Sequence, residues 1–97
     1  MALAVGWGLP IPAAAQSYDP ADEWHGLPAG EGREEVFYTC VACHSMATVM
    51  QQRLSRRWWE LTIERMVDDM GMAEPDAAER EIILDYLEEH FGQDSPR

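Results

Sequence analysis

Apolar residues recur with the period of an α-helix in two stretches of the C-terminal half of the chain. The first stretch, residues 55–70, has its apolar positions at Trp58, Trp59, Ile63, Met66, Val67 and Met70. The second, residues 76–91, has them at Ile82, Ile83, Tyr86, Leu87 and Phe91. Spacings of three and four residues place such side chains on one face of a helix. Because the alternation of a half-buried strand is not seen, the pattern predicts two amphipathic helices.

The residues that flank these stretches support the same boundaries. Ser55 is suited to cap the N-terminus of the first helix, and Gly71 is suited to the position just after its end. Asp76, with Glu79 three residues later, has the spacing of a capping box, and Gly92 follows the last turn of the second helix.

One more helix is predicted before these two, from about Gly32 to Cys43. Glu34 and Glu35 fall in its first turn, where negative charge suits the helix dipole. Residues 45–54 are then a connector, and its apolar members are expected to line a crevice. We therefore expect an all-α fold of about three helices in one domain, residues 32–97.

The N-terminal region is expected to lie outside this domain. Residues 1–15 have the pattern of a cleaved signal peptide, because an apolar run too short to span a bilayer precedes the small residues Ala13–Ala15. The usual basic start is missing, which leaves open a longer signal upstream. Residues 16–31 are predicted to form an extended arm anchored by Trp24 and Leu27. Export predicts a periplasmic protein without a membrane span in its mature chain.

The charge balance restricts the partners. The formal net charge is −11, 26% of the residues are charged, and no lysine is present. Nucleic acid and anionic lipid both bind basic surfaces, so neither is an expected partner. The acidity suits attraction to a basic docking surface on a partner protein, or it serves solubility alone.

The candidate chemistry lies in Cys40-Val41-Ala42-Cys43-His44, which has the Cys-x-x-Cys-His signature of covalent haem attachment. Two thiols three residues apart on a helical turn share a face, where both can bond to the vinyl groups at one edge of a porphyrin. The imidazole of His44 can then reach the iron from the same side. We expect one covalent haem c, which would exchange single electrons and would add an apolar body to a small core.

Three other interpretations of the motif are weaker. A thioredoxin-like redox pair belongs to a βαβ context. A zinc site needs a second pair of ligands, and only His25 and His90 remain. A disulfide between Cys40 and Cys43 would close a very small loop. The haem interpretation also agrees with export, because haem is attached to such thiols outside the bacterial cytoplasm.

A methionine thioether commonly provides the second axial ligand of such an iron. Met72 is the expected ligand, because it follows the predicted end of a helix and has no helical neighbour to pack against. Met70 is the runner-up, and Met66, on a stripe that suits core packing, is a further candidate. His25, expected in solvent, and His90, near a helix end, are the remaining candidates.

Arg53, Arg56 and Arg57 form a basic cluster in this acidic chain. Two of them lie at a predicted helix N-terminus, where positive charge is unfavourable. Haem propionates, a docking surface and ordinary exposure to solvent are the three explanations that the sequence allows. Arg53 is the expected propionate contact, together with Trp59, whose indole N–H can donate to a carboxylate or belong to the core.

The chain resembles the small class I monohaem cytochromes c. The resemblance rests on the haem signature after a short helix, on a loop methionine, on Ile83-x-x-Tyr86-Leu87 in the last helix, and on Gly32, eight residues before Cys40. In that family the first helix crosses the last at this small residue. Val36 departs from the pattern, since the family usually has an aromatic residue there. Residues 45–74 also lack the proline whose carbonyl often accepts a hydrogen bond from the haem histidine.

A narrower resemblance is to the cytochrome subunits of bacterial sulfite dehydrogenases. It is carried by Leu27-Pro-x-Gly-x-Gly-Arg-Glu-Glu-Val-Phe, Gln52-Arg53-Leu54-Ser55-Arg56, Trp59, Gly71-Met72 and Ile83-Leu-Asp-Tyr-Leu. In those proteins the haem subunit takes electrons from a molybdenum-cofactor subunit. The resemblance implies an electron carrier rather than an enzyme, which accepts electrons from a periplasmic dehydrogenase and passes them to a respiratory cytochrome or oxidase. A gas-binding sensor with five-coordinate iron is the alternative.

Overall fold

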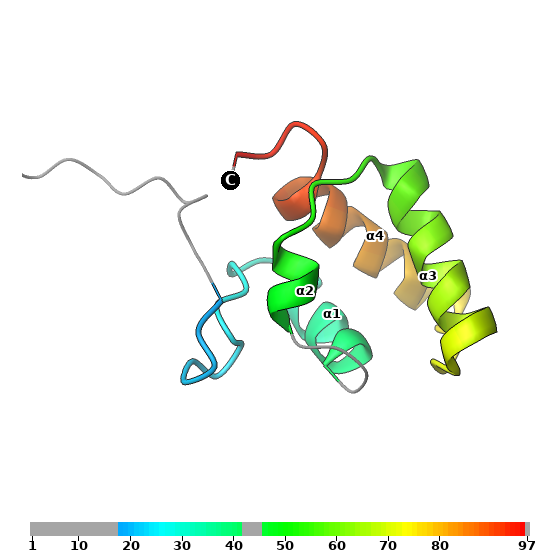
Figure 1. The fold of residues 1–97 in the computed structure, drawn as a ribbon, viewed down its shortest axis with the longest axis horizontal. Helices are drawn as coiled ribbons and strands as arrows, with labels where there is room; N and C mark the ends of the chain where they lie inside the picture. Colours follow the sequence, from blue (N-terminus) through cyan, green and yellow to red (C-terminus); the bar gives the residue numbers. More distant parts are fainter. Residues whose placement is uncertain (1–17, 42–45, 97) are drawn as a thin grey trace, which may run out of the picture.

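A computed structural model describes residues 18–41 and 46–96 of the 97-residue chain. Its helices are α1 (Arg33–Cys40), α2 (Met46–Met50), α3 (Arg56–Met70) and α4 (Ala77–Phe91). Helix α4 packs against both α1 and α3, and α2 packs against α1 (Figure 1). These two ranges contain no strand, only a single isolated bridge between Leu54 and Gly92. The predicted all-α class is confirmed, with four helices in place of about three.

The additional helix is α2, which lies where the sequence predicts a connector. Met46, Val49 and Met50 are buried, and their spacing places them on one face of the helix. A helix of five residues gains little from its own hydrogen bonds, so its stability comes from packing this face against the rest of the core. The prediction of a non-helical connector is therefore wrong for residues 46–50.

The predicted boundaries of α3 are confirmed. The Ser55 hydroxyl accepts a hydrogen bond from the backbone N–H of Trp58, at 3.3 Å, and so caps the first turn. At the other end Gly71 adopts the left-handed conformation, with φ of 75°, and its N–H donates to the carbonyl of Met66. A glycine adopts this conformation without the steric cost that a side chain would add.

Helix α4 begins and ends as the sequence predicts. The carboxylate of Asp76 accepts a hydrogen bond of 2.8 Å from the backbone N–H of Glu79, and Gly92 follows the last residue. Its buried side chains are Ile83, Leu84, Tyr86, Leu87 and Phe91. Leu84 lies outside the predicted stripe and is buried as well, in a helix that packs against both α1 and α3.

Helices α1 and α4 approach closely at Gly32. This residue has φ of 97°, and a Cβ atom built on it would lie 3.0 Å from the Ile82 carbonyl oxygen and 3.0 Å from the Tyr86 Cβ. The small residue expected at this crossing is therefore confirmed, because any side chain would push the helices apart. The part of the first helix predicted beyond Val41 lies outside the described residues.

In the described part of the N-terminal arm, residues 18–31, the chain forms turns and a bend over residues 20–26, so it is not extended there. The carboxylate of Asp22 accepts hydrogen bonds from the backbone N–H groups of Gly26 and Trp24, and these bonds lower the pKa of that carboxyl. Leu27 is buried and Trp24 packs against the core, as predicted for the two anchors. The signal peptide predicted over residues 1–15 lies outside the described residues.

His25 differs from its prediction. It is half-buried, and its ring lies 5.0 Å from the ring of Phe37, measured between centroids. The turns of the arm fold the imidazole against α1, so solvent does not surround it. Tyr86 ties the same arm to α4, because its hydroxyl donates to the carbonyl of Pro28. Burial raises the pKa of this phenol.

Within residues 18–41 and 46–96, no helix is both long enough and apolar enough to cross a bilayer.

Candidate functional site

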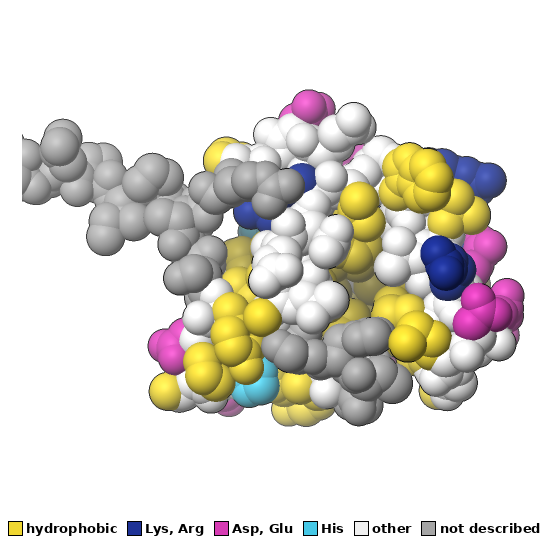
Figure 2. Space-filling view, viewed as in Figure 1, with side chains coloured by type: hydrophobic (Ala, Val, Ile, Leu, Met, Phe, Trp, Pro, Cys, Tyr) yellow, Lys and Arg dark blue, Asp and Glu magenta, His cyan; other side chains and the backbone are white. Residues whose placement is uncertain are grey.

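A cavity of about 330 Å³ lies where all four helices meet. In the space-filling view it is a hollow with apolar side chains in its depth, between the side occupied by α2 and the side occupied by α3 (Figure 2). Its lining residues are Thr39, Cys40, Thr48, Val49, Gln52, Leu54, Trp59, Thr62, Ile63, Arg65, Met66, Asp69, Met70, Ile83 and Leu87. This volume falls in the range of pockets that hold small ligands and cofactors.

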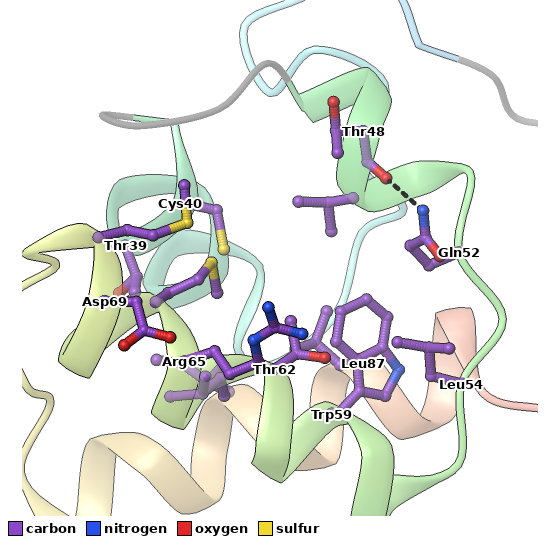
Figure 3. Close-up of a pocket in the computed structure, with 15 residues that line it drawn as sticks. Thr39, Cys40, Thr48, Gln52, Leu54, Trp59, Thr62, Arg65, Asp69 and Leu87 are labelled. Carbon is purple, nitrogen blue, oxygen red and sulfur yellow. Dashed lines mark hydrogen bonds between the residues drawn. The ribbon is translucent and has the colours of Figure 1, made fainter.

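Helix α3 forms the longest wall of the cavity. Trp59, Ile63, Met66 and Met70 are three or four residues apart, so one face of this helix turns toward the cavity. Trp59 and Ile63 are buried, and Leu87 of α4 continues this apolar floor. The polar lining residues include Thr48 and Gln52, joined by a hydrogen bond of 3.3 Å from the Gln52 amide to the Thr48 carbonyl (Figure 3).

Cys40, the first cysteine of the haem signature, ends α1 in the wall of this cavity and is 4% exposed. Figure 3 shows it on the side opposite Trp59 and Leu54. Cys43 and His44 lie outside the described residues. A flat apolar group attached at Cys40 fits what is described, because the cavity beside this thiol has aliphatic and indole walls and contains thioether sulfur.

Two methionines line the cavity, and the predicted ligand is not one of them. Met66 is half-buried, and Met70 is 56% exposed. Met72 is 9% exposed and belongs to the core, so the expectation that it lacks a packing partner is wrong. It lines a second hollow, of about 410 Å³, together with Tyr38 and Thr39.

The left-handed turn at Gly71 is the reason for this placement of Met72. It reverses the chain after α3, and the backbone N–H of Met72 donates to the Met66 carbonyl at 3.0 Å. The side chain is thereby directed back into the core. The two other candidate ligands, His25 and His90, are also not among the residues that line the cavity. Ligation of iron by Met72 stays a prediction.

Trp59 belongs to the core in this structure, which is one of the two roles expected for it. Its indole N–H donates to the backbone carbonyl of Phe91 at 3.0 Å, and the residue is 3% exposed. The bond links the start of α3 to the end of α4, so the indole serves the core. A propionate contact through this N–H would have to replace the bond to Phe91.

Arg53 is held by backbone carbonyls. Its guanidinium donates twice to Pro96, at 2.9 and 3.1 Å, and also to Met50 and Gln52, at 3.0 and 2.7 Å. It lies over the ring of Phe91, 5.2 Å from the centroid, and it is not among the cavity's lining residues. A propionate contact by Arg53 stays a prediction, and these hydrogen bonds already use four of its five N–H donors.

The other two arginines of the cluster also separate. Arg56 pairs with Glu81, Asp85 and Glu88 of α4, at 2.8 to 2.9 Å, and these carboxylates raise its pKa. They offset the unfavourable position of Arg56 at a helix N-terminus. Arg57 is exposed and has one longer contact, 3.8 Å to Glu60.

Arg65 and Asp69 are charged residues of the cavity lining, and the sequence pattern singles out neither. Arg65 lines the cavity from α3, and in Figure 3 its guanidinium lies between Cys40 and Trp59. Its position next to Met66, on the flank of the apolar stripe, is the signal that indicates this location. The cluster of Arg53, Arg56 and Arg57 is more conspicuous in the sequence, and it does not include Arg65.

Comparisons with protein families, curated proteins and solved structures find no significant match to this chain.

Proposed function

We propose that this protein is a periplasmic monohaem c-type cytochrome that carries single electrons and performs no bond chemistry itself. The observation that carries the proposal is the position of Cys40, because the first thiol of a Cys-x-x-Cys-His sequence is buried in the wall of an apolar cavity. Methionine sulfur on the same cavity supports the ligand set of such a protein.

The residues have distinct roles in this proposal. Cys40 and Cys43 would hold the haem covalently, and His44 would bind its iron. A bound haem supplies an iron that takes up and releases one electron. Val49, Ile63 and Leu87 exclude water from the cavity, which tunes the potential at which the electron is exchanged. A methionine would supply a second protein ligand to the iron.

Met66 is the methionine that the cavity favours. It lines the cavity, it is half-buried, and it follows Ile63 on the inward face of α3. Met70 is the alternative within the same cavity, but it is more exposed and lies at the end of the helix. Met72, the ligand that the sequence pattern predicts, would have to leave its packed position in the core.

The proposed partners follow from charge and from the resemblance. A net charge of −11 favours docking to a basic surface, and association steered in this way weakens as salt rises. We propose that a periplasmic dehydrogenase, such as a molybdenum-cofactor sulfite dehydrogenase, reduces the protein. The electron then passes to a respiratory cytochrome or oxidase.

Three methionine-to-leucine variants test the ligand assignment. Leucine is close to methionine in volume, so each variant removes the sulfur and largely keeps the packing. In the oxidised protein we expect the weak long-wavelength band of methionine–iron ligation in wild type, in Met70→Leu and in Met72→Leu. Met66→Leu should lack it. Visible absorption spectra of the purified haem-loaded proteins provide the measurement.

Two other outcomes would change the conclusion. Loss of the band in Met72→Leu or Met70→Leu alone would assign the ligand to that residue and refute Met66. A wild-type protein that lacks the band and binds carbon monoxide readily when reduced would be a sensor with five-coordinate iron, and the carrier proposal would then fail.

A further inference from the structure

Arg65 differs from the other described arginines in having no partner. Arg53 and Arg56 are held by carbonyls and by carboxylates, and Arg57 and Arg80 each have a carboxylate within 4.0 Å. Arg33 lies over the ring of Trp24. The side chain of Arg65 makes no ion pair, hydrogen bond or ring contact with any described residue.

This isolation contrasts with the surroundings of Arg65. The chain carries 18 acidic residues against 7 basic ones, so carboxylates are abundant. Asp69 is one turn further along the same helix and lines the same cavity, yet within the described structure the two side chains form no ion pair. A guanidinium that is exposed at the edge of an apolar cavity is therefore available to a ligand.

The charges around the cavity define what such a ligand offers. Its ionisable lining residues, among those the structure describes, are Cys40 of α1 and Arg65 and Asp69 of α3. The lining residues from α2, from the loop before α3 and from α4 are uncharged: Thr48, Val49, Gln52, Leu54, Ile83 and Leu87. Among the described lining residues Arg65 is thus the single cation on a mostly apolar wall, which suits a ligand with an apolar body and a carboxylate at its edge.

We propose that Arg65 is a positioning residue whose guanidinium pairs with a carboxylate of the group bound in this cavity. The inference rests on the proposed function, under which that group is a haem and the carboxylate is one of its propionates. Arg65 thereby takes the role that the sequence assigns to Arg53. An arginine suits it, because its planar guanidinium pairs with a carboxylate through two parallel hydrogen bonds.

The pairing has a consequence for the redox potential. A cation beside a propionate lowers the pKa of that carboxyl. The positive guanidinium also repels the positive charge of a ferric iron, which disfavours the oxidised form and raises the midpoint potential. Removing Arg65 should therefore lower the midpoint potential. The midpoint potential changes with pH where the propionate takes up a proton. Removing Arg65 should raise the pH of this change by about one unit, because the position is exposed.

The experiment compares Arg65→Gln, Arg65→Lys, Arg53→Gln and Arg57→Gln in haem-loaded protein, by redox titration between about pH 4 and 9. Arg57 is the matched control, because it lies on the same helix and is 72% exposed. We expect a lower midpoint potential and a pH-dependent step at higher pH in Arg65→Gln. Both changes should be smaller in Arg65→Lys, which keeps the charge, and absent in Arg57→Gln. Circular dichroism checks that each variant keeps its helices.

Two results would overturn the inference while leaving the proposed function intact. In one, Arg65→Gln has the potential and pH profile of the wild type. In the other, Arg53→Gln moves the step and Arg65→Gln does not, which would return the role to Arg53. Absence of haem from the wild-type protein is a different result, because it refutes the proposed function itself.

Discussion

At the scale of single residues, the same side chain serves different purposes according to its neighbours. Arg53 and Arg56 are three residues apart, yet the first binds backbone carbonyls near the C-terminus and the second binds carboxylates of α4. Sequence proximity predicts a basic cluster here. The structure instead divides the cluster between two elements, because Arg53 precedes the extended N-cap residue Ser55 and Arg56 lies in the first turn of α3.

Arg56→Gln should lower the free energy of unfolding by about 1 kcal/mol in low salt. Its three partners are half to three-quarters exposed, and pairs of this kind contribute roughly 0.2–1 kcal/mol each, with less when they share one guanidinium. The loss should shrink in 1 M salt, because screening already weakens the pairs in the wild type. Urea unfolding at two salt concentrations measures both effects.

Arg57→Gln is the control for this prediction. Its side chain is 72% exposed and its contact with Glu60 is long, so we expect a change within about 0.5 kcal/mol at either salt concentration. Equal losses in the two variants, or a loss in Arg56→Gln that salt does not alter, would show that the network with α4 contributes nothing specific.

At the scale of elements, long helices could be predicted from the sequence and the short one could not. Helices α3 and α4 each extend over about four turns, so the period of their apolar residues can be recognised, and capping residues mark their ends. Five residues of α2 are too few to display a period, and their helical state depends on contacts with distant parts of the chain. Likewise, the burial of Met72 depends on the turn at Gly71, which redirects the chain after α3.

Two glycine-to-alanine variants test how the elements are joined. Both residues have left-handed backbones, which cost an alanine about 1–2 kcal/mol. A Cβ at Gly71 meets nothing within 4 Å, so we expect the left-handed backbone to account for the whole loss in the free energy of unfolding. A Cβ at Gly32 meets the Ile82 carbonyl oxygen at 3.0 Å, and overpacking adds roughly 1–3 kcal/mol.

Urea unfolding of both variants gives the comparison. We expect Gly32→Ala to be the more destabilised, because it forces α1 and α4 apart. Similar losses in the two variants would mean that the helices do not approach as closely at Gly32 as the structure indicates.

At the scale of the whole molecule, the site arises from the meeting of four helices. The sequence identifies Cys40 as a chemical residue, since its motif is local. It does not identify Arg65 or Met66 as cavity residues, because this depends on where α3 crosses the other helices. A chain of this size has a small core, and a covalent apolar group that fills the cavity would add to its stability.

The central claim is that a haem is attached to Cys40 and Cys43, and intact-mass spectrometry tests it most directly. The chain should be secreted from a bacterial host that matures c-type cytochromes, beside a variant with Cys40→Ser and Cys43→Ser. We predict that the wild-type chain is coloured and heavier than its polypeptide by one haem, even after denaturation, and that the variant is not. A colourless wild-type protein with the mass of its polypeptide alone would contradict the account.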